Sequence, residues 1–172
     1  EGLIALSGCR HGEIPRLLMD KKPDQALAAA RAYARAFGPD HFFIELQRHY
    51  VRGESQLLAR LKTLADRAGL DVVATGNAHY IHPHQRKVHD VLRCIQHQTI
   101  LESAGGLLPR NDEYVLRSPE EMEALFRDMP VALENALRIA ERCTSACDYL
   151  PSGVQIFPEA PLFANCAPHE HL

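Results

Sequence analysis

Apolar and polar residues follow one another along this chain in patterns that predict both strands and helices. Residues 42–47 form a short apolar run typical of a strand, and the unbroken run at 71–75 indicates a parallel strand covered on both faces. Between them, residues 54–68 carry apolar side chains at helical spacing, and Gly69 can end that helix. Residues 42–75 therefore predict a right-handed β-α-β unit, which places the chain in the α/β class.

Further helices are predicted on both sides of this unit. The segment 118–129 begins with a strong signal, because Ser118 can cap the helix, Pro119 suits its first position and Glu121 completes a capping box. From Pro151 onward the sequence has no helical or strand period, so a linker or frayed tail is expected there. The other predicted helices are residues 16–19, 25–37, 85–98 and 131–142.

Composition and charge exclude several classes of protein. The 172 residues have a net charge of −3, 6% aromatic residues and no Trp, which argues against a chain-wide basic footprint for nucleic acid and against a stacking platform for single strands. No apolar run is long enough to span a membrane. Five cysteines at irregular spacing favour a reducing cytoplasm over a disulfide framework. The chain starts at Glu1 and enters an apolar run at once, so we expect a fragment of a longer protein.

Polar side chains follow both predicted strands of the β-α-β unit. Residues 47–49 and 76–80 each carry a histidine, and chemistry gathers at the carboxyl ends of strands in α/β proteins. His49 is therefore a candidate site residue. Asn77 and His79 lie two apart after the second strand and can present two side chains to one point. An aspartate at position 77 would make a ready metal or phosphoester site, whereas asparagine is a poorer, uncharged ligand.

Two further residues carry open alternatives. Cys9 is either a small buried thiol at a tight turn or a thiolate metal ligand. Glu45 lies between Ile44 and Leu46 in the first strand, so it points away from both. Its carboxylate is either exposed to solvent or aimed into a barrel, where burial needs a partner such as a metal ion or an arginine.

Several motifs in order resemble the PHP (polymerase and histidinol phosphatase) domain of bacterial DNA polymerase III alpha subunits. Residues 6–9 with 12–14, then 42–49 and 73–80, carry the resemblance. The blocks at 89–95 and 111–122 strengthen it, and together they look most similar to the error-prone branch of that family. The resemblance covers about residues 1–158, and the ordered series of motifs is more specific than any one of them.

The resemblance implies a fold and a division of the chain. Residues 1–100 would be the C-terminal half of a PHP domain, and so part of a distorted β/α barrel of seven strands. Residues 101–150 would form a helical connection toward the polymerase palm, and residues 151–172 a linker or disordered tail. The first metal motifs of the family would lie before Glu1, and the palm aspartates that catalyse nucleotide addition are absent.

The resemblance also implies a metal site. Cys9 matches the cysteine ligand of the family, His79 matches its last histidine, and Glu45 matches its motif, but Asn77 stands where metal-competent members have aspartate. Zn or Mn would bind at the PHP site, and Mg at the polymerase centre that this chain lacks. In metal-bearing members the PHP site is linked to a 3′–5′ exonuclease that removes misincorporated nucleotides. Because Asn77 removes a negative charge, we predict a degenerate site with a structural role.

The predicted function is that of a fragment of an error-prone, DNA-directed DNA polymerase in replication and translesion repair synthesis, without nucleotidyltransferase activity of its own. Its partners would be DNA and deoxynucleotides through the full-length enzyme, together with other replication subunits, and no membrane. One alternative is a metal-dependent PHP phosphoesterase of the histidinol-phosphatase type or a 3′–5′ exonuclease. Another is a decayed, non-enzymatic fragment. The block at 111–122 favours the polymerase over the phosphatase.

Overall fold

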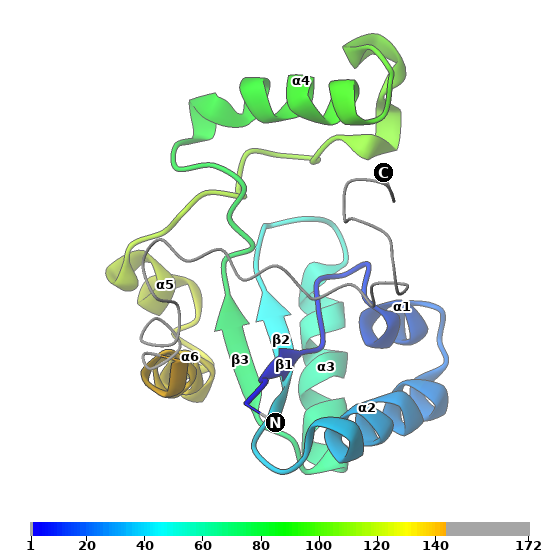
Figure 1. Ribbon diagram of the computed structural model, residues 1–172, viewed down its shortest axis with the longest axis vertical. Coiled ribbons are helices and arrows are strands. Elements are labelled where there is room, and N and C mark those ends of the chain that lie inside the picture. The colour runs from blue at the N-terminus through cyan, green and yellow to red at the C-terminus, as the bar shows by residue number, and fades with distance from the viewer. Residues whose placement is uncertain (1, 144–172) are drawn as a thin grey trace, which may run out of the picture. The chain divides into compact units, whose positions relative to one another are not determined.

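The computed structural model describes residues 2–143. The chain divides into two units, residues 1–141 and 142–172, and the contacts below lie in the first. In the described residues a parallel sheet has the order β1 (Ala5–Leu6), β2 (Phe42–Gln47) and β3 (Val72–Thr75) (Figure 1). The helix α3 (Glu54–Ala68) connects β2 to β3, which confirms the predicted strand, helix and strand.

The main core forms where three helices pack on the sheet. Helices α1 (Glu13–Met19) and α2 (Pro23–Phe37) pack against each other and against α3 (Figure 1). Helix α1 starts earlier than predicted, because Pro15 falls in the first turn, where a backbone N–H has no helical partner to lose. The side chains that fill this core are Ile14, Leu18, Ala26, Ala30, Ile44, Leu46, Leu61 and Leu64.

The sheet is also covered on its second face and along its β3 edge. Phe43 and Ile44 point to opposite faces of β2 and both are buried. Val73 and Ala74 are buried in the same way on β3, which confirms the doubly covered strand predicted at 71–75. Helix α6 (Pro130–Cys143) lies beside β3, and Asn135 Nδ2 donates a 2.8 Å hydrogen bond to the Val72 carbonyl at its start. A side chain thereby pairs with one of the carbonyls of an edge strand.

Helix α5 (Pro119–Leu125) begins as predicted. The Ser118 hydroxyl accepts from the Glu121 amide at 3.3 Å, and the Ser118 amide donates to the Glu121 carboxylate at 2.7 Å. Phe126 follows the helix and is fully buried, with the Arg48 guanidinium 5.0 Å from its ring centre. Arg48 thus joins the loop after β2 to the end of α5.

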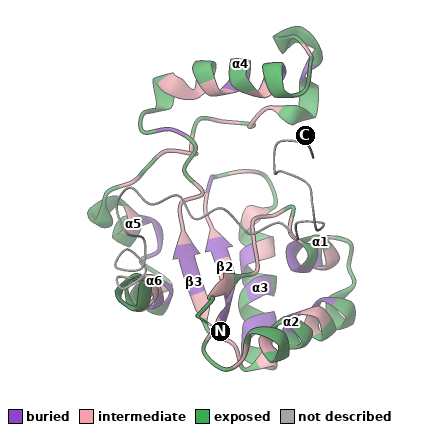
Figure 2. Cartoon of the chain, in the orientation of Figure 1, coloured by how far each residue is buried: buried purple, intermediate pink, exposed green. Residues whose placement is uncertain are grey.

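Helix α4 (Arg86–Gln96) differs from the other long helices in its exposure. It follows the short 3-10 turn η1 (Pro83–Gln85) and packs chiefly against η1 and η2 (Leu101–Ser103). Its apolar stripe faces solvent, with Val88 63% exposed and Ile95 68% exposed. Figure 2 shows this contrast between α4 and the buried strands β2 and β3.

The predicted helical connection at 101–150 is only partly helical. In the described part of the chain, residues 101–118 contain the 3-10 turns η2 and η3 (Gly105–Leu107) and extended backbone, and α-helix begins at Pro119. The predicted tail at 151–172 lies outside the described residues. Within residues 2–143, no helix combines the length and apolar character needed to cross a bilayer.

Candidate functional site

The loops that follow the three parallel strands meet at one edge of the sheet, because parallel strands end on the same side. A fourth segment joins them from far along the sequence. The His79 amide donates to the Tyr114 carbonyl at 2.8 Å, and Tyr80 pairs with Val115 as an isolated parallel bridge. We call the side chains that these segments bring together the polar edge. They are Cys9, Glu45, His49, Asn77, His79 and Tyr114.

A tight turn holds Cys9 at the polar edge. The Gly12 amide donates to the Cys9 carbonyl at 2.7 Å, and a Cβ atom at Gly12 would lie 2.7 Å from the Ser7 carbonyl oxygen, so only glycine fits there. The Ser7 hydroxyl accepts a 2.9 Å hydrogen bond from the Glu45 amide, which fixes the turn to β2. The predicted turn is therefore present, and the Cys9 thiol is partly rather than fully buried.

Glu45 lies between the two environments that the sequence left open, since it is neither fully exposed nor fully buried. One carboxylate oxygen accepts a 2.8 Å hydrogen bond from Gln47 Nε2 and a second hydrogen bond from the Thr75 hydroxyl. Gln47 and Thr75 are partners in the register of β2 and β3, so the sheet itself brings this cluster together. Two neutral donors thus bond one oxygen of the Glu45 carboxylate.

His49 is the most buried polar residue of the edge, with 4% of its surface exposed. Its Nε2 lies 3.0 Å from the Gly76 carbonyl oxygen. Since a carbonyl only accepts, Nε2 carries the proton and is not available as a ligand. The imidazole stacks on the Tyr114 ring, with ring centres 4.1 Å apart and planes 13° from parallel. His49 therefore ties the loop after β2 to the loop after β3 and to residues 111–116.

Glu54, the first residue of α3, fixes the backbone around His49. Its carboxylate oxygens accept 2.8 Å hydrogen bonds from the amides of His49 and Tyr50, and Oε1 lies 3.6 Å from His49 Nδ1. Burial raises the pKa of Glu54, but the hydrogen bonds from His49 and Tyr50 outweigh it, so the net pKa is below the ordinary value of 4.5. An ionised carboxylate thus holds this loop at neutral pH.

His79 lies between two aromatic neighbours. Its ring centre is 4.9 Å from that of His89 on α4 and 5.5 Å from that of Tyr114. Burial lowers the pKa of His79 below the ordinary 6.5, and the charges of His89, Arg93 and His49 lower it further. His79 is therefore neutral at physiological pH.

Asn77 has a left-handed backbone with φ of 44°. Asparagine tolerates this conformation better than most residues, so the amide side chain suits the shape of this turn.

The side chains of the polar edge do not by themselves make up a complete site for a divalent metal ion within the described residues. A protein site for such an ion commonly supplies at least three ligands. His49 and Glu45 already bond protein groups, Asn77 brings no charge, and this leaves Cys9 and His79. Within residues 2–143, no three His, Cys, Asp or Glu side chains are grouped to hold a metal ion.

Sequence reasoning missed three residues that complete the site, namely Glu54, Asn111 and Tyr114. Asn111 Nδ2 donates to the His49 carbonyl across 62 residues of sequence. No local periodicity relates residues so far apart, and the block at 111–122 was visible only through its resemblance to a family. A carboxylate in the first turn of a predicted helix was the one local signal for Glu54.

Comparisons with known proteins agree with the resemblance drawn from the motifs. Residues 1–49 match the PHP domain family. The error-prone DNA polymerase of Symbiobacterium thermophilum is 42% identical over 148 residues, which are 86% of this chain and 14% of that protein. The DNA polymerase III alpha subunit of Treponema pallidum is 37% identical over 143 residues, 83% of this chain and 12% of that protein.

The alpha subunit of Thermus aquaticus is 34% identical over 168 residues, which are 95% of this chain and 13% of that protein. The chain therefore spans only 12–14% of the length of these three relatives. By its PHP match and by these relatives, the chain is identified with the PHP-containing region of bacterial DNA polymerase III alpha subunits and error-prone DNA polymerases.

Proposed function

We propose that this chain is part of a DNA-directed DNA polymerase of the error-prone type, and that its PHP portion supports the polymerase structurally. The names of the relatives favour a polymerase, since they are an error-prone DNA polymerase and DNA polymerase III alpha subunits. In this proposal the whole enzyme binds DNA and deoxynucleotides and acts in replication and translesion synthesis. The chain alone has no nucleotidyltransferase activity.

The proposed structural role rests on the hydrogen bonds that the side chains of the polar edge make. Ser7 binds the backbone of Glu45, His49 binds the Gly76 carbonyl and Asn111 binds the His49 carbonyl. These bonds join the loops after β1, β2 and β3 to residues 111–116. Side chains that could act in catalysis instead form hydrogen bonds between segments of the chain. This arrangement is expected of a domain that supports the rest of the protein.

The alternative is a metal-dependent phosphoesterase or 3′–5′ exonuclease, in which Zn or Mn would activate a water for attack on a phosphodiester. The presence of Cys9 and His79 at the same edge favours this reading. It is weakened by Asn77, which stands where metal-competent members of the family have aspartate, and by the hydrogen bonds that occupy Glu45 and His49.

The test uses the complete polymerase that contains this segment. Primer extension and 3′-end removal from a mismatched primer are measured for the parent protein, for Cys9→Ala and for a control, His84→Ala, at an exposed position of η1. We expect extension in all three and no mismatch removal above that of an enzyme-free sample. Mismatch removal that Cys9→Ala abolishes and His84→Ala preserves would assign the exonuclease. Absence of extension in the parent would refute the polymerase.

A further inference from the structure

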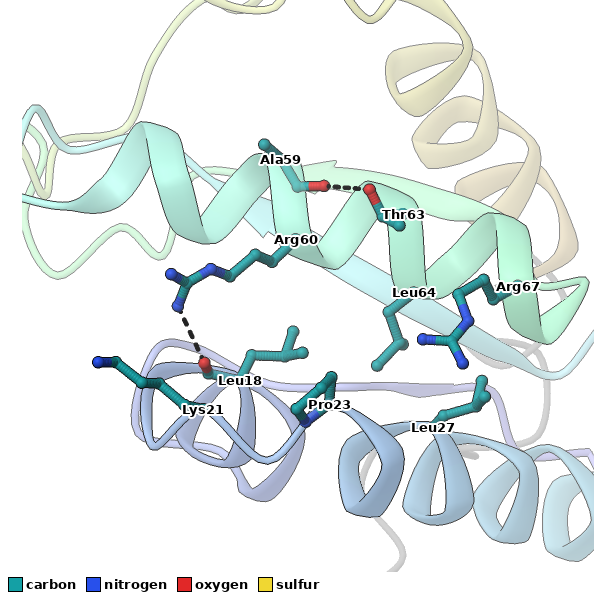
Figure 3. A pocket seen from close by; sticks show the side chains of 9 residues that line it. All are labelled: Leu18, Lys21, Pro23, Leu27, Ala59, Arg60, Thr63, Leu64 and Arg67. Atoms are coloured by element: carbon teal, nitrogen blue, oxygen red, sulfur yellow. Dashed lines mark hydrogen bonds between the residues drawn. The ribbon is translucent and has the colours of Figure 1, made fainter.

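A pocket of about 440 Å³ opens among the helices, away from the polar edge. It lies where the corner between α1 and α2 faces the second half of α3 (Figure 3). Helix α3 leads from the carboxyl end of β2 to the amino end of β3, so this half of α3 points away from the loops that form the polar edge. The volume falls in the range usual for ligand pockets. The apolar side chains in its lining are Leu18, Pro23, Leu27 and Leu64.

The charged side chains of this pocket are all cationic. Lys21, Arg60 and Arg67 line it and no acidic residue does, although the chain as a whole carries a net charge of −3. Figure 3 shows Lys21 and Arg60 at one end and Arg67 with Leu27 at the other, and Leu18, Pro23 and Leu64 lie between them. A ligand that matches this lining is negative at both ends and apolar in the middle.

The cations are arranged to receive such a ligand. Arg60 donates a 3.0 Å hydrogen bond to the Leu18 carbonyl, which fixes its guanidinium and leaves further N–H groups for a ligand. Arg67 lies 3.6 Å from Asp24, but the Asp24 side chain is 91% exposed, so this ion pair is weak and open to exchange. Among the described residues, no acidic side chain lies within ion-pair distance of Lys21 or Arg60.

We propose that this pocket binds an acidic, amphipathic peptide segment of a partner protein. Apolar side chains of the peptide would pack on Leu18, Leu27 and Leu64, and carboxylates on either side would pair with Lys21 and Arg67. The apolar floor favours a peptide over a small hydrophilic anion, which would leave that floor uncovered. Separated charges at the two ends would set the register of the peptide, as in other sites where a segment lies along helices.

The test measures fluorescence anisotropy of labelled peptides added to the 172-residue chain. The panel places two leucines between acidic residues at varied spacing, and its control peptides replace Glu by Gln or Leu by Ser. We expect at least one acidic peptide to bind with a dissociation constant of about 10–100 μM. Its Gln and Ser counterparts bind much more weakly, and about 1 M salt, where the Debye length is about 3 Å, weakens binding.

Two charge reversals locate the binding. Lys21→Glu combined with Arg67→Glu should weaken binding at least about tenfold, whereas Lys22→Glu, at an exposed neighbour outside the pocket, should not change it. Far-UV circular dichroism checks that each variant is folded. The proposal is overturned if no acidic peptide binds better than its control peptides. It is also overturned if the variant with Lys21→Glu and Arg67→Glu binds as the parent does. Competition by free glutarate as strong as by the unlabelled peptide would assign the pocket to a small anion and overturn it too.

Discussion

Replacing Glu54 by glutamine tests the claim that an ionised carboxylate holds the polar edge in place. The Glu54 side chain is 13% exposed and accepts 2.8 Å hydrogen bonds from the amides of His49 and Tyr50. Glutamine keeps one acceptor oxygen and turns an NH₂ group toward the other amide. One charged hydrogen bond is lost and a buried donor is left without a partner.

The expected loss follows from the type of bond removed. A hydrogen bond to a charged group contributes roughly 1.5–3 kcal/mol, so Glu54→Gln should lower the free energy of unfolding by about 2 kcal/mol. In a chain of this length, that corresponds to a fall in Tm of about 6 °C. Glu123→Gln, at an exposed position of α5, is the matched control and should change Tm by less than about 1 °C.

The pH dependence separates charge from packing. The folded pKa of Glu54 is below its ordinary value of 4.5, so its stabilisation is complete above pH 4.5 and is lost as pH falls through the folded pKa. Thermal unfolding followed by circular dichroism at pH 7 and at about pH 3 should show the difference between parent and Glu54→Gln shrinking in acid. An equal difference at both pH values, or none at pH 7, would refute the role of the charge.

Three further predictions concern other parts of the chain. Phe126→Ala should cost about 4 kcal/mol in urea unfolding, because the ring is fully buried beside Arg48, and a loss below about 1 kcal/mol would contradict the packing described. The His79 ring protons should titrate in NMR spectra with a midpoint below pH 6.5, so the contribution of His79 to stability is complete above that pH and declines in acid, and a midpoint above 6.5 would refute its burial among cationic groups. Leu92→Ser, at a residue 59% exposed on α4, should leave Tm unchanged, whereas a large fall in Tm would show that the stripe is covered.

Elements with a long, regular period could be predicted from the sequence. The strand at 42–47 and the helix at 54–68 occur with the predicted bounds, and the Ser118 capping box forms as predicted. The strand β1 was missed because its two residues, Ala5 and Leu6, show no period and are defined only by pairing with β2. Helical spacing in α4 predicts an apolar stripe but not whether another element covers it.

The candidate site could be predicted only as far as the topology allows. The two predicted parallel strands place His49 and His79 at one edge in advance. Cys9 follows β1, the strand that was missed, so its place at this edge was indicated only by the resemblance to the family. The partners that decide their chemistry come through distant pairing. Thr75 reaches Glu45 across 30 residues through the register of two strands, and Tyr114 reaches His49 from beyond α4. The spacing of apolar and polar residues along the sequence holds no information about contacts between such distant residues.

The structural role proposed for the PHP portion is tested most sharply by measuring metal binding to the complete polymerase that we propose contains this segment. Zinc and manganese are titrated by calorimetry into the metal-stripped protein and into its Cys9→Ala variant, and the metal retained after gel filtration is counted by mass spectrometry. We expect far less than one retained ion per chain at the PHP site, and the same result for both proteins. One tightly held ion per chain that Cys9→Ala releases would contradict it.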